Sequence, residues 1–342
     1  MNPARGERTT IAHTSDDGWL ATLQRDYAVT GRPLQWPVSD TLRAAPAVTL
    51  RDRFAEHLAA ESAYDIALRY VYLTPAQMRT LVRLAERHFL PHRLRGRGIE
   101  LGAGCGVLAA VVAKRSDVEA VLAVEVCERI TELLIPRIAA HVLGRSAHKV
   151  VPITGSFDDL RIPDASLDFA IENDSLHHSD DLAVTMSECA RVLKPGGLLL
   201  CFDRCHDDSV SDDDVERMLA KVYSRDYLLA NCYPSDLVLT RRENGEHEYR
   251  LFEWRAAGAA AGLVLLGKHD VVRRVPFKHA VKGLCSALPP AARSRLYRTA
   301  NADLATTRRW AGQVARRLAG RARVAPMLAP KSTSILVFQK PS

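Results

Sequence analysis

The stretch that decides the fold is Gly98-Ile99-Glu100-Leu101-Gly102-Ala103-Gly104-Cys105-Gly106. A strand-like run enters a glycine-rich turn, and a helix-like run leaves it. Glycines at such a turn permit positive φ and let a ligand approach the backbone closely. The spacing Gly102-x-Gly104-x-Gly106 differs from the G-x-G-x-x-G of dinucleotide sites. Because Glu100 suits a cationic group better than a pyrophosphate, we expect a ligand that carries an amine or a sulfonium.

Short apolar runs alternate with helical stretches on both sides of this turn. Strands are predicted at 98–101, 120–125, 149–154, 167–172, 198–203, 263–272 and 334–339. Helices are predicted at 106–115, 127–143, 181–192, 215–229 and 249–262. The alternation predicts an α/β fold with a doubly wound, mostly parallel, seven-stranded sheet, whose ligands bind beyond the carboxyl ends of the strands.

Polar and aromatic residues follow the next predicted strands. Glu125 ends the second strand, where an acid accepts hydrogen bonds from ribose hydroxyls. Ser156 and Phe157 follow the third strand, where a hydroxyl can bond the edge of an adenine and a phenyl ring can stack on it. Phe157 fits a core position equally well. These residues indicate a nucleoside ligand without identifying it.

Taken in order, the motifs resemble those of the class I S-adenosylmethionine-dependent methyltransferases. The resemblance rests on E-x-G-x-G-x-G at 100–106, the acid at 125, GSFDDLRIPDASLDFA at 155–170, NDSLHH at 173–178 and RVLKPGGLLL at 191–200. It covers roughly residues 95–205, and FEWRAAGAAAGL at 252–263 resembles the family's approach to its sixth strand. The resemblance implies a Rossmann-like enzyme that uses S-adenosylmethionine and releases S-adenosylhomocysteine.

The resemblance also implies which residues hold the donor. The methionine end would lie on Glu100, Gly102, Ala103, Gly104 and Gly106, the ribose on Glu125 and Val126, the adenine on Ser156, Phe157 and Asp158, and the sulfonium side on Glu172 and Asn173. The chain departs from the family at one point. Where the family often has Gly-Asp, this chain has Gly155-Ser156, and Asp158 is the candidate replacement.

Methyl transfer to a hydroxyl or an ammonium requires a base that removes the acceptor's proton. His177 and His178 follow the fourth strand and Glu172 ends it, so these three are the candidate catalytic residues. In the family, an LHH turn also occurs with a purely structural histidine. Asp203, His206, Asp207 and Asp208 could bind a divalent metal, but acidic runs of this kind are typical of a solvated loop, so we expect no metal.

Four parts are expected along the chain. Residues 1–92 form an N-terminal helical extension or lid, 93–205 the donor-binding α/β core, 206–250 an insertion or lid, and 251–342 complete the core with a basic helical insertion at about 273–330. Residues 1–40 are expected to be loosely ordered and 49–89 to be helical. Tyr64, Tyr70 and Tyr72 are candidate lid aromatics, or core residues.

Composition limits the partners. Nothing resembles a signal peptide or a membrane span, and the seven scattered cysteines form no C-x-x-C pair, so we expect a cytoplasmic protein without a membrane partner. Residues 273–323 carry thirteen Lys or Arg and one acid within a net charge of +7. That segment is either a solvated face or a surface for an anionic partner, and since it has no nucleic-acid motif we do not expect nucleic acid to bind.

The predicted function is methylation of a small-molecule acceptor, with an anionic compound of specialised metabolism as the favoured kind. Three alternatives stay open: a nucleic-acid methyltransferase that uses the basic segment, a nicotinamide-dependent oxidoreductase, and a module that binds the donor without catalysis. The sequence leaves open the acceptor, the methylated atom and the oligomeric state, for which a homodimer is one option.

Overall fold

The computed structural model describes residues 18–71, 74–231, 233–273 and 331–342. The chain divides into two compact units, residues 1–269 with 334–342 and residues 270–333. The expected basic insertion falls almost entirely on residues 274–330, outside the described residues. All of the predicted site residues belong to the first unit.

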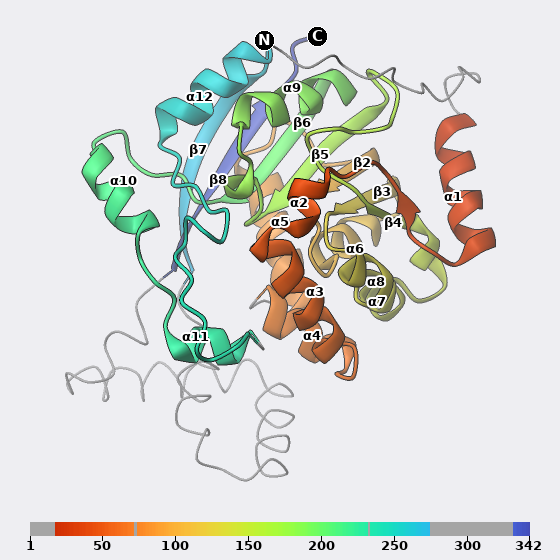
Figure 1. Ribbon diagram of the computed structural model, residues 1–342. Helices are drawn as coiled ribbons and strands as arrows, with labels where there is room; N and C mark the ends of the chain where they lie inside the picture. The colour runs from red at the N-terminus through yellow and green to blue at the C-terminus, as the bar shows by residue number, and fades with distance from the viewer. Residues whose placement is uncertain (1–17, 72–73, 232, 274–330) are drawn as a thin grey trace, which may run out of the picture. The chain divides into compact units, whose positions relative to one another are not determined.

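An eight-stranded sheet runs through the described part of the chain (Figure 1). Its strands are β1 (Leu34–Gln35), β2 (Gly96–Leu101), β3 (Val118–Glu125), β4 (Val150–Thr154), β5 (Leu167–Asn173), β6 (Leu193–Asp203), β7 (Val264–Arg273) and β8 (Lys331–Gln339). The order is β1-β4-β3-β2-β5-β6-β8-β7. Pairing is parallel from β1 to β6 and antiparallel between β6 and β8. This confirms the predicted fold class, with all seven predicted strands present and β1 added at the edge.

Helices cover both faces of the sheet. One apolar cluster joins α1 (Gly18–Thr30), α9 (Leu182–Val192) and α12 (Leu251–Ala260) to the strands, with Trp254 and Phe338 fully buried in it. A second group packs together around α6 (Val107–Ala113), which lies against β3 and contacts α5 (Pro75–His88) and α8 (Ile135–Leu143). The chain order reverses on either side of β2, and such a switch point is where open α/β sheets bind ligands.

Residues 18–40 have more regular structure than the sequence predicted. Helix α1 buries Trp19 and Leu20, and β1 pairs in parallel with β4. Gly31 takes φ +62° in the turn between α1 and β1. It therefore ends the helix without disordering the chain, since burial of the apolar face of α1 stabilises the segment.

Two predicted helices are each divided. Residues 127–143 form α7 (Glu128–Leu133) and α8, because Pro136 lies in the first turn of α8 and supplies no N–H to a continuous helix. Residues 215–229 contribute to α10 (Asp212–Leu219) and α11 (Arg225–Ala230). The side chains of Ser211 and Ser224 cap these two helices, which makes each a separate element.

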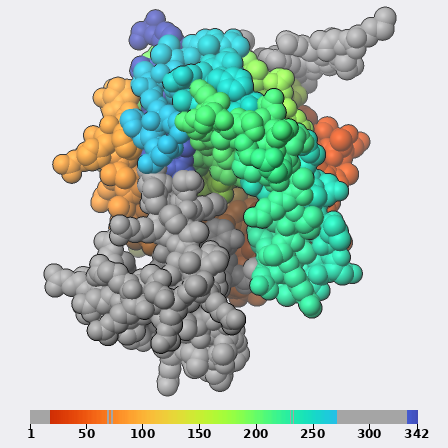
Figure 2. All heavy atoms as spheres, turned by 90° about the vertical axis from the view of Figure 1, so that its left-hand side faces the viewer, coloured from red at the N-terminus to blue at the C-terminus, as the bar shows by residue number. Residues whose placement is uncertain are grey.

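The helical character predicted for 49–89 is present in α3 (Pro46–Leu58), α4 (Ala63–Tyr70) and α5, preceded by the short α2 (Asp40–Ala44). Thr74 and Gln77 form a capping box at the start of α5. Helices α10 and α11, within the green-to-teal segment of Figure 2, lie at the surface. No helix among the described residues is long and apolar enough to cross a membrane.

Candidate active site

The glycine loop after β2, residues 102–106, is a turn in which three of the five residues have no side chain. Gly102, Gly104 and Gly106 all have positive φ, at +59°, +51° and +78°. A Cβ at Gly102 would lie 2.6 Å from Cβ of Ser175, and one at Gly104 would lie 2.6 Å from Cε1 of Tyr70. The N–H of Ala103 donates to the carbonyl of Val124 at 2.8 Å, which fixes the loop on β3. Both the conformation and the close neighbours therefore require glycine at these positions.

Glu100 is buried beneath this loop, at 2% exposure. Its Oε2 accepts a hydrogen bond at 2.7 Å from the N–H of Ala109, the third residue of α6. The N-cap of α6 is Gly106, which has no side chain to do this. Burial raises the pKa of Glu100 well above its ordinary value. The structure thus gives Glu100 a helix-capping role that sequence reasoning missed, and its contact with a ligand stays a prediction.

Glu125 joins two turns at the end of β3. Its Oε2 accepts from the N–H of Gly104 at 2.8 Å, and its Oε1 accepts from the N–H of Cys127 at 3.1 Å. Val126 lies in the bend between them. Since each carboxylate oxygen has two lone pairs, Glu125 can hold the loop and still accept from a ribose hydroxyl.

Glu172 is the last residue but one of β5 and has no exposed surface. Its Oε2 accepts from the N–H of Ser175 at 3.1 Å, while its buried Oε1 has no hydrogen-bond partner among the described residues. Burial and the nearby Asp203 raise the pKa of Glu172 well above its ordinary value. Ser175 is the residue that packs against Gly102, so an orphaned carboxylate oxygen lies next to the glycine loop. A cationic donor end would fit this oxygen. Asn173 follows as the last residue of β5.

His177 and Asp203 form a buried pair between the ends of β5 and β6. Nδ1 of His177 lies 2.6 Å from Oδ1 of Asp203, and the backbone N–H of His177 donates to Oδ2 at 3.0 Å. The two residues are 2% and 1% exposed. When Nδ1 donates to the carboxylate, Nε2 keeps its lone pair and can take a proton. A neighbouring carboxylate also stabilises the imidazolium that results.

His178 has a different environment. Its Nδ1 lies 2.9 Å from the carbonyl oxygen of Gly245, which can only accept, so Nδ1 carries the hydrogen. Burial, followed by the nearby His177, lowers the pKa of His178 well below its ordinary value. The ring is therefore neutral at pH 7, with its lone pair on Nε2. The two histidine rings are 4.3 Å apart between centroids.

The segment 206–250, which the sequence predicts to be an insertion, supports both histidines. Besides the Gly245 contact, the N–H of His247 donates to the carbonyl of His177 at 2.8 Å. Behind them, two arginines and two glutamates form a largely buried network: Arg204, Arg241, Glu246 and Glu248. This part of the insertion is therefore an ordered support for the site.

The residues first considered for a metal have hydrogen-bond partners. Ligand atoms of Asp174, His177 and Asp203 come within 4.8 Å of one another. Asp203 already accepts from His177 and from the N–H of Arg204, and His206 bonds Glu248 through Nε2. Asp207 and Asp208 are exposed, as expected of a solvated loop, whereas Asp203 and His206 are part of the packed site. The absence of a metal stays a prediction.

The predicted adenine contacts lie after β4. The hydroxyl of Ser156 accepts from the N–H of Asp158 at 3.1 Å, and Oδ1 of Asp158 accepts from the hydroxyl of Thr185. Burial raises the pKa of Asp158. Phe157 packs on the core cluster, and its ring would lie 3.7 Å from a Cβ at Gly102. Phe157 is thus both a partial core residue and a neighbour of the glycine loop.

Tyr70 is the predicted lid aromatic that reaches the site, since its ring lies over Gly104. It stacks on Phe54 of α3 with centroids 5.9 Å apart, and the guanidinium of Arg51 lies 5.5 Å from its centroid. Tyr64 is on the same helix, half-buried, and Tyr72 lies outside the described residues. The N-terminal helices therefore cover the glycine loop.

Comparisons with known proteins agree with this geometry. Residues 99–201 match the family described as "Methyltransferase domain". A probable S-adenosylmethionine-dependent methyltransferase of Mycolicibacterium smegmatis is 34% identical over 135 residues, which are 36% of this chain and 48% of that protein. Malonyl-[acyl-carrier protein] O-methyltransferase 1 of Coxiella burnetii is 37% identical over 73 residues, 21% of this chain and 26% of that one.

Among solved structures, the [4+2]-cyclase SpnF matches with a TM-score of 0.51 at 19% identity, over 90% of this chain and 99% of that one. A likeness at this identity shows the fold alone. The chain spans about half the length of the first curated relative and about a quarter of the second.

Residues 99–201, which hold the glycine loop and the acids at the strand ends, match an α/β domain of the methyltransferase kind. The family match over residues 99–201 and the similarity to the first curated relative support a class I S-adenosylmethionine-dependent methyltransferase that uses S-adenosylmethionine.

Proposed function

We propose that the protein transfers a methyl group from S-adenosylmethionine to a hydroxyl or an amine of a small molecule, with His177 as the general base. The observation that carries this proposal is the His177–Asp203 pair, buried at the same sheet edge as the glycine loop. A base beside the donor is what proton-coupled methyl transfer needs.

The donor residues divide into three groups in this proposal. Gly102, Gly104 and the orphaned Oε1 of Glu172 hold the methionine and sulfonium end, Glu125 the ribose, and Ser156, Phe157 and Asp158 the adenine side. When bound, S-adenosylmethionine supplies a methyl group already activated as a sulfonium. The residues of the chain then have to exclude water and hold the acceptor's nucleophilic atom in line with the methyl group and the sulfur.

The two histidines take different roles. Nε2 of His177 removes the acceptor's proton, and Asp203 stabilises the imidazolium that forms. His178, kept neutral by its surroundings, accepts a hydrogen bond from the acceptor and orients it. Environments that differ in this way commonly separate the roles of two titratable neighbours.

A small acceptor is favoured because the site is covered by helices α3 and α4 on one side and by the 241–250 segment on the other. An origin in specialised metabolism stays a prediction. The name of SpnF describes a cyclase, so the fold by itself does not fix the reaction.

The test incubates the full chain with S-adenosylmethionine and a panel of phenols, amines and carboxylic acids, and measures S-adenosylhomocysteine by mass spectrometry. Product that depends on a panel member supports the proposal. Tight donor binding with no product from any member favours a non-catalytic module. Salt-sensitive binding of RNA or DNA, with methylation of either, favours the nucleic-acid alternative.

A further inference from the structure

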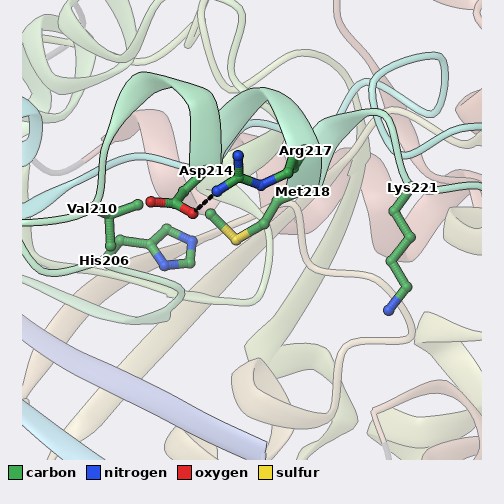
Figure 3. A pocket seen from close by; sticks show the side chains of 6 residues that line it. All are labelled: His206, Val210, Asp214, Arg217, Met218 and Lys221. Carbon is green, nitrogen blue, oxygen red and sulfur yellow. Dashed lines mark hydrogen bonds and ion pairs between the residues drawn. The ribbon is translucent and has the colours of Figure 1, made fainter.

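A cavity of about 390 Å³ lies between α10 and the loop that follows β6 (Figure 3). Six side chains line it: His206, Val210, Asp214, Arg217, Met218 and Lys221. Val210 and Met218 supply apolar surface, and the remaining lining residues are titratable. This volume is within the range of pockets that bind small molecules.

The charges around the cavity do not cancel. Arg217 is paired with Asp214, as the dashed line in Figure 3 shows, and Asp214 also accepts from the hydroxyl of Ser211. Lys221 stands apart from this pair, and within the described part of the chain its ammonium has no ion pair or hydrogen bond. The cavity therefore combines an apolar lining with one uncommitted positive charge.

Contacts connect this cavity to the proposed base. Nε2 of His206, in the cavity wall, bonds Glu248, and Glu248 pairs with Arg204 at 3.1 Å. The N–H of Arg204 donates to Asp203, which holds His177. The cavity and the base thus share one packed support at the end of β6, although neither His177 nor His178 lines the cavity.

The α10 wall of the cavity is held by several contacts. Ion pairs join Glu216 to Arg242 and Asp212 to Arg250. Leu219 is the buried residue of this helix, and its carbonyl accepts from the N–H of Arg242 at 3.0 Å. The cavity therefore has a defined wall on this side.

We propose that this cavity is a further ligand site, which binds an apolar molecule with one anionic group. The anion pairs with Lys221 while the apolar body lies against Met218 and Val210. This inference adds a binding site to the proposed methyl transfer and does not depend on it. Charge complementarity selects the anion, because Arg217 is already neutralised by Asp214.

The experiment measures binding of 2-naphthoate and of neutral 2-naphthylmethanol to the full chain by calorimetry. We expect the wild-type protein to prefer naphthoate by about tenfold. Lys221→Gln should remove this preference, and Lys221→Arg should keep it. Met218→Trp, which fills the cavity, should abolish binding of both compounds. Arg145→Gln, at an exposed cation outside the cavity lining, is the matched control and should change nothing.

Titration of the same variants with S-adenosylmethionine separates the two proposals. The cavity proposal is overturned if naphthoate binds all the variants as it binds wild type, or if it does not bind wild type at millimolar concentration. If the variants still bind the donor normally, the methyl-transfer proposal is untouched. If wild type itself does not bind the donor, methyl transfer fails, while binding of naphthoate still decides the cavity proposal.

Discussion

Nδ1 of His177 lies 2.6 Å from Oδ1 of Asp203, although 26 residues separate them in the chain. The pairing of β5 with β6 brings them together, because both residues lie where these parallel neighbours end. A buried imidazole that is oriented by a carboxylate has a defined tautomer, and this relationship is the chemical centre of the proposed reaction.

Asp203→Asn should lower turnover by tenfold or more, about 1.4 kcal/mol of transition-state stabilisation, with little change in donor affinity. The amide cannot stabilise the imidazolium as the carboxylate does. Steady-state kinetics with the best acceptor of the panel measures this. Asp207→Asn, at an exposed acid of the same loop, is the control. Equal turnover of Asp203→Asn and wild type would remove Asp203 from the mechanism.

Alanine variants of the two histidines should differ. His177→Ala should lose most of the turnover at unchanged donor affinity, because it removes the base. His178→Ala should chiefly raise KM for the acceptor, because it removes an orienting contact. If His178→Ala loses turnover and His177→Ala does not, the two roles are reversed, and if neither loses it, neither is the base.

His178 should make stability depend on pH below about 6.5. The unfolded chain takes up a proton near that pH, whereas the folded chain resists it because the pKa of His178 is well below its ordinary value. The free energy of unfolding therefore falls as pH drops from about 6.5 toward the folded pKa. In His178→Asn, thermal unfolding between pH 7.5 and 5.5 should show a smaller decrease in Tm. An unchanged slope would show that His178 is not the titrating group.

Glu172→Gln should stabilise the fold and impair function. The pKa of Glu172 is raised, so above about pH 4.5 the unfolded carboxyl ionises while the folded one resists, which costs stability. At pH 7.5 the variant should gain at least about 2 °C in Tm, and this gain should disappear near pH 4. Donor affinity should fall tenfold or more, since Oε1 is the oxygen that we assign to the sulfonium side. A variant with lower Tm at pH 7.5 would contradict the assigned burial cost.

Gly104→Ala should destabilise the protein more than Gly262→Ala. Both glycines have positive φ, which costs alanine about 1 kcal/mol, but a Cβ at Gly262 meets nothing within 4 Å. At Gly104 it meets the ring of Tyr70 as well. Urea unfolding compares the two variants, and in a Tyr70→Ala background Gly104→Ala should cost no more than Gly262→Ala does. Equal effects of the two single substitutions would show that Tyr70 does not lie over the loop.

The sequence allowed the sheet and the glycine-rich turn to be predicted, because apolar strands and glycines leave local patterns. Glu125 followed from its place at a strand end. The cap that Glu100 provides could not be predicted, since it depends on the side chain reaching a helix in the next segment. The same holds for the Gly245 carbonyl, which fixes the tautomer of His178 from 67 residues away. Contacts of this kind arise from the tertiary structure alone.

Calorimetric titration with S-adenosylmethionine, beside NADH and beside the Glu125→Gln variant, tests the central claim most directly. Glu125 holds Gly104 and is assigned to the ribose. We predict that wild type binds S-adenosylmethionine and not NADH, and that Glu125→Gln weakens donor binding by tenfold or more, about 1.4 kcal/mol. Binding of NADH without binding of S-adenosylmethionine, or full donor affinity in Glu125→Gln, would contradict the account of this site.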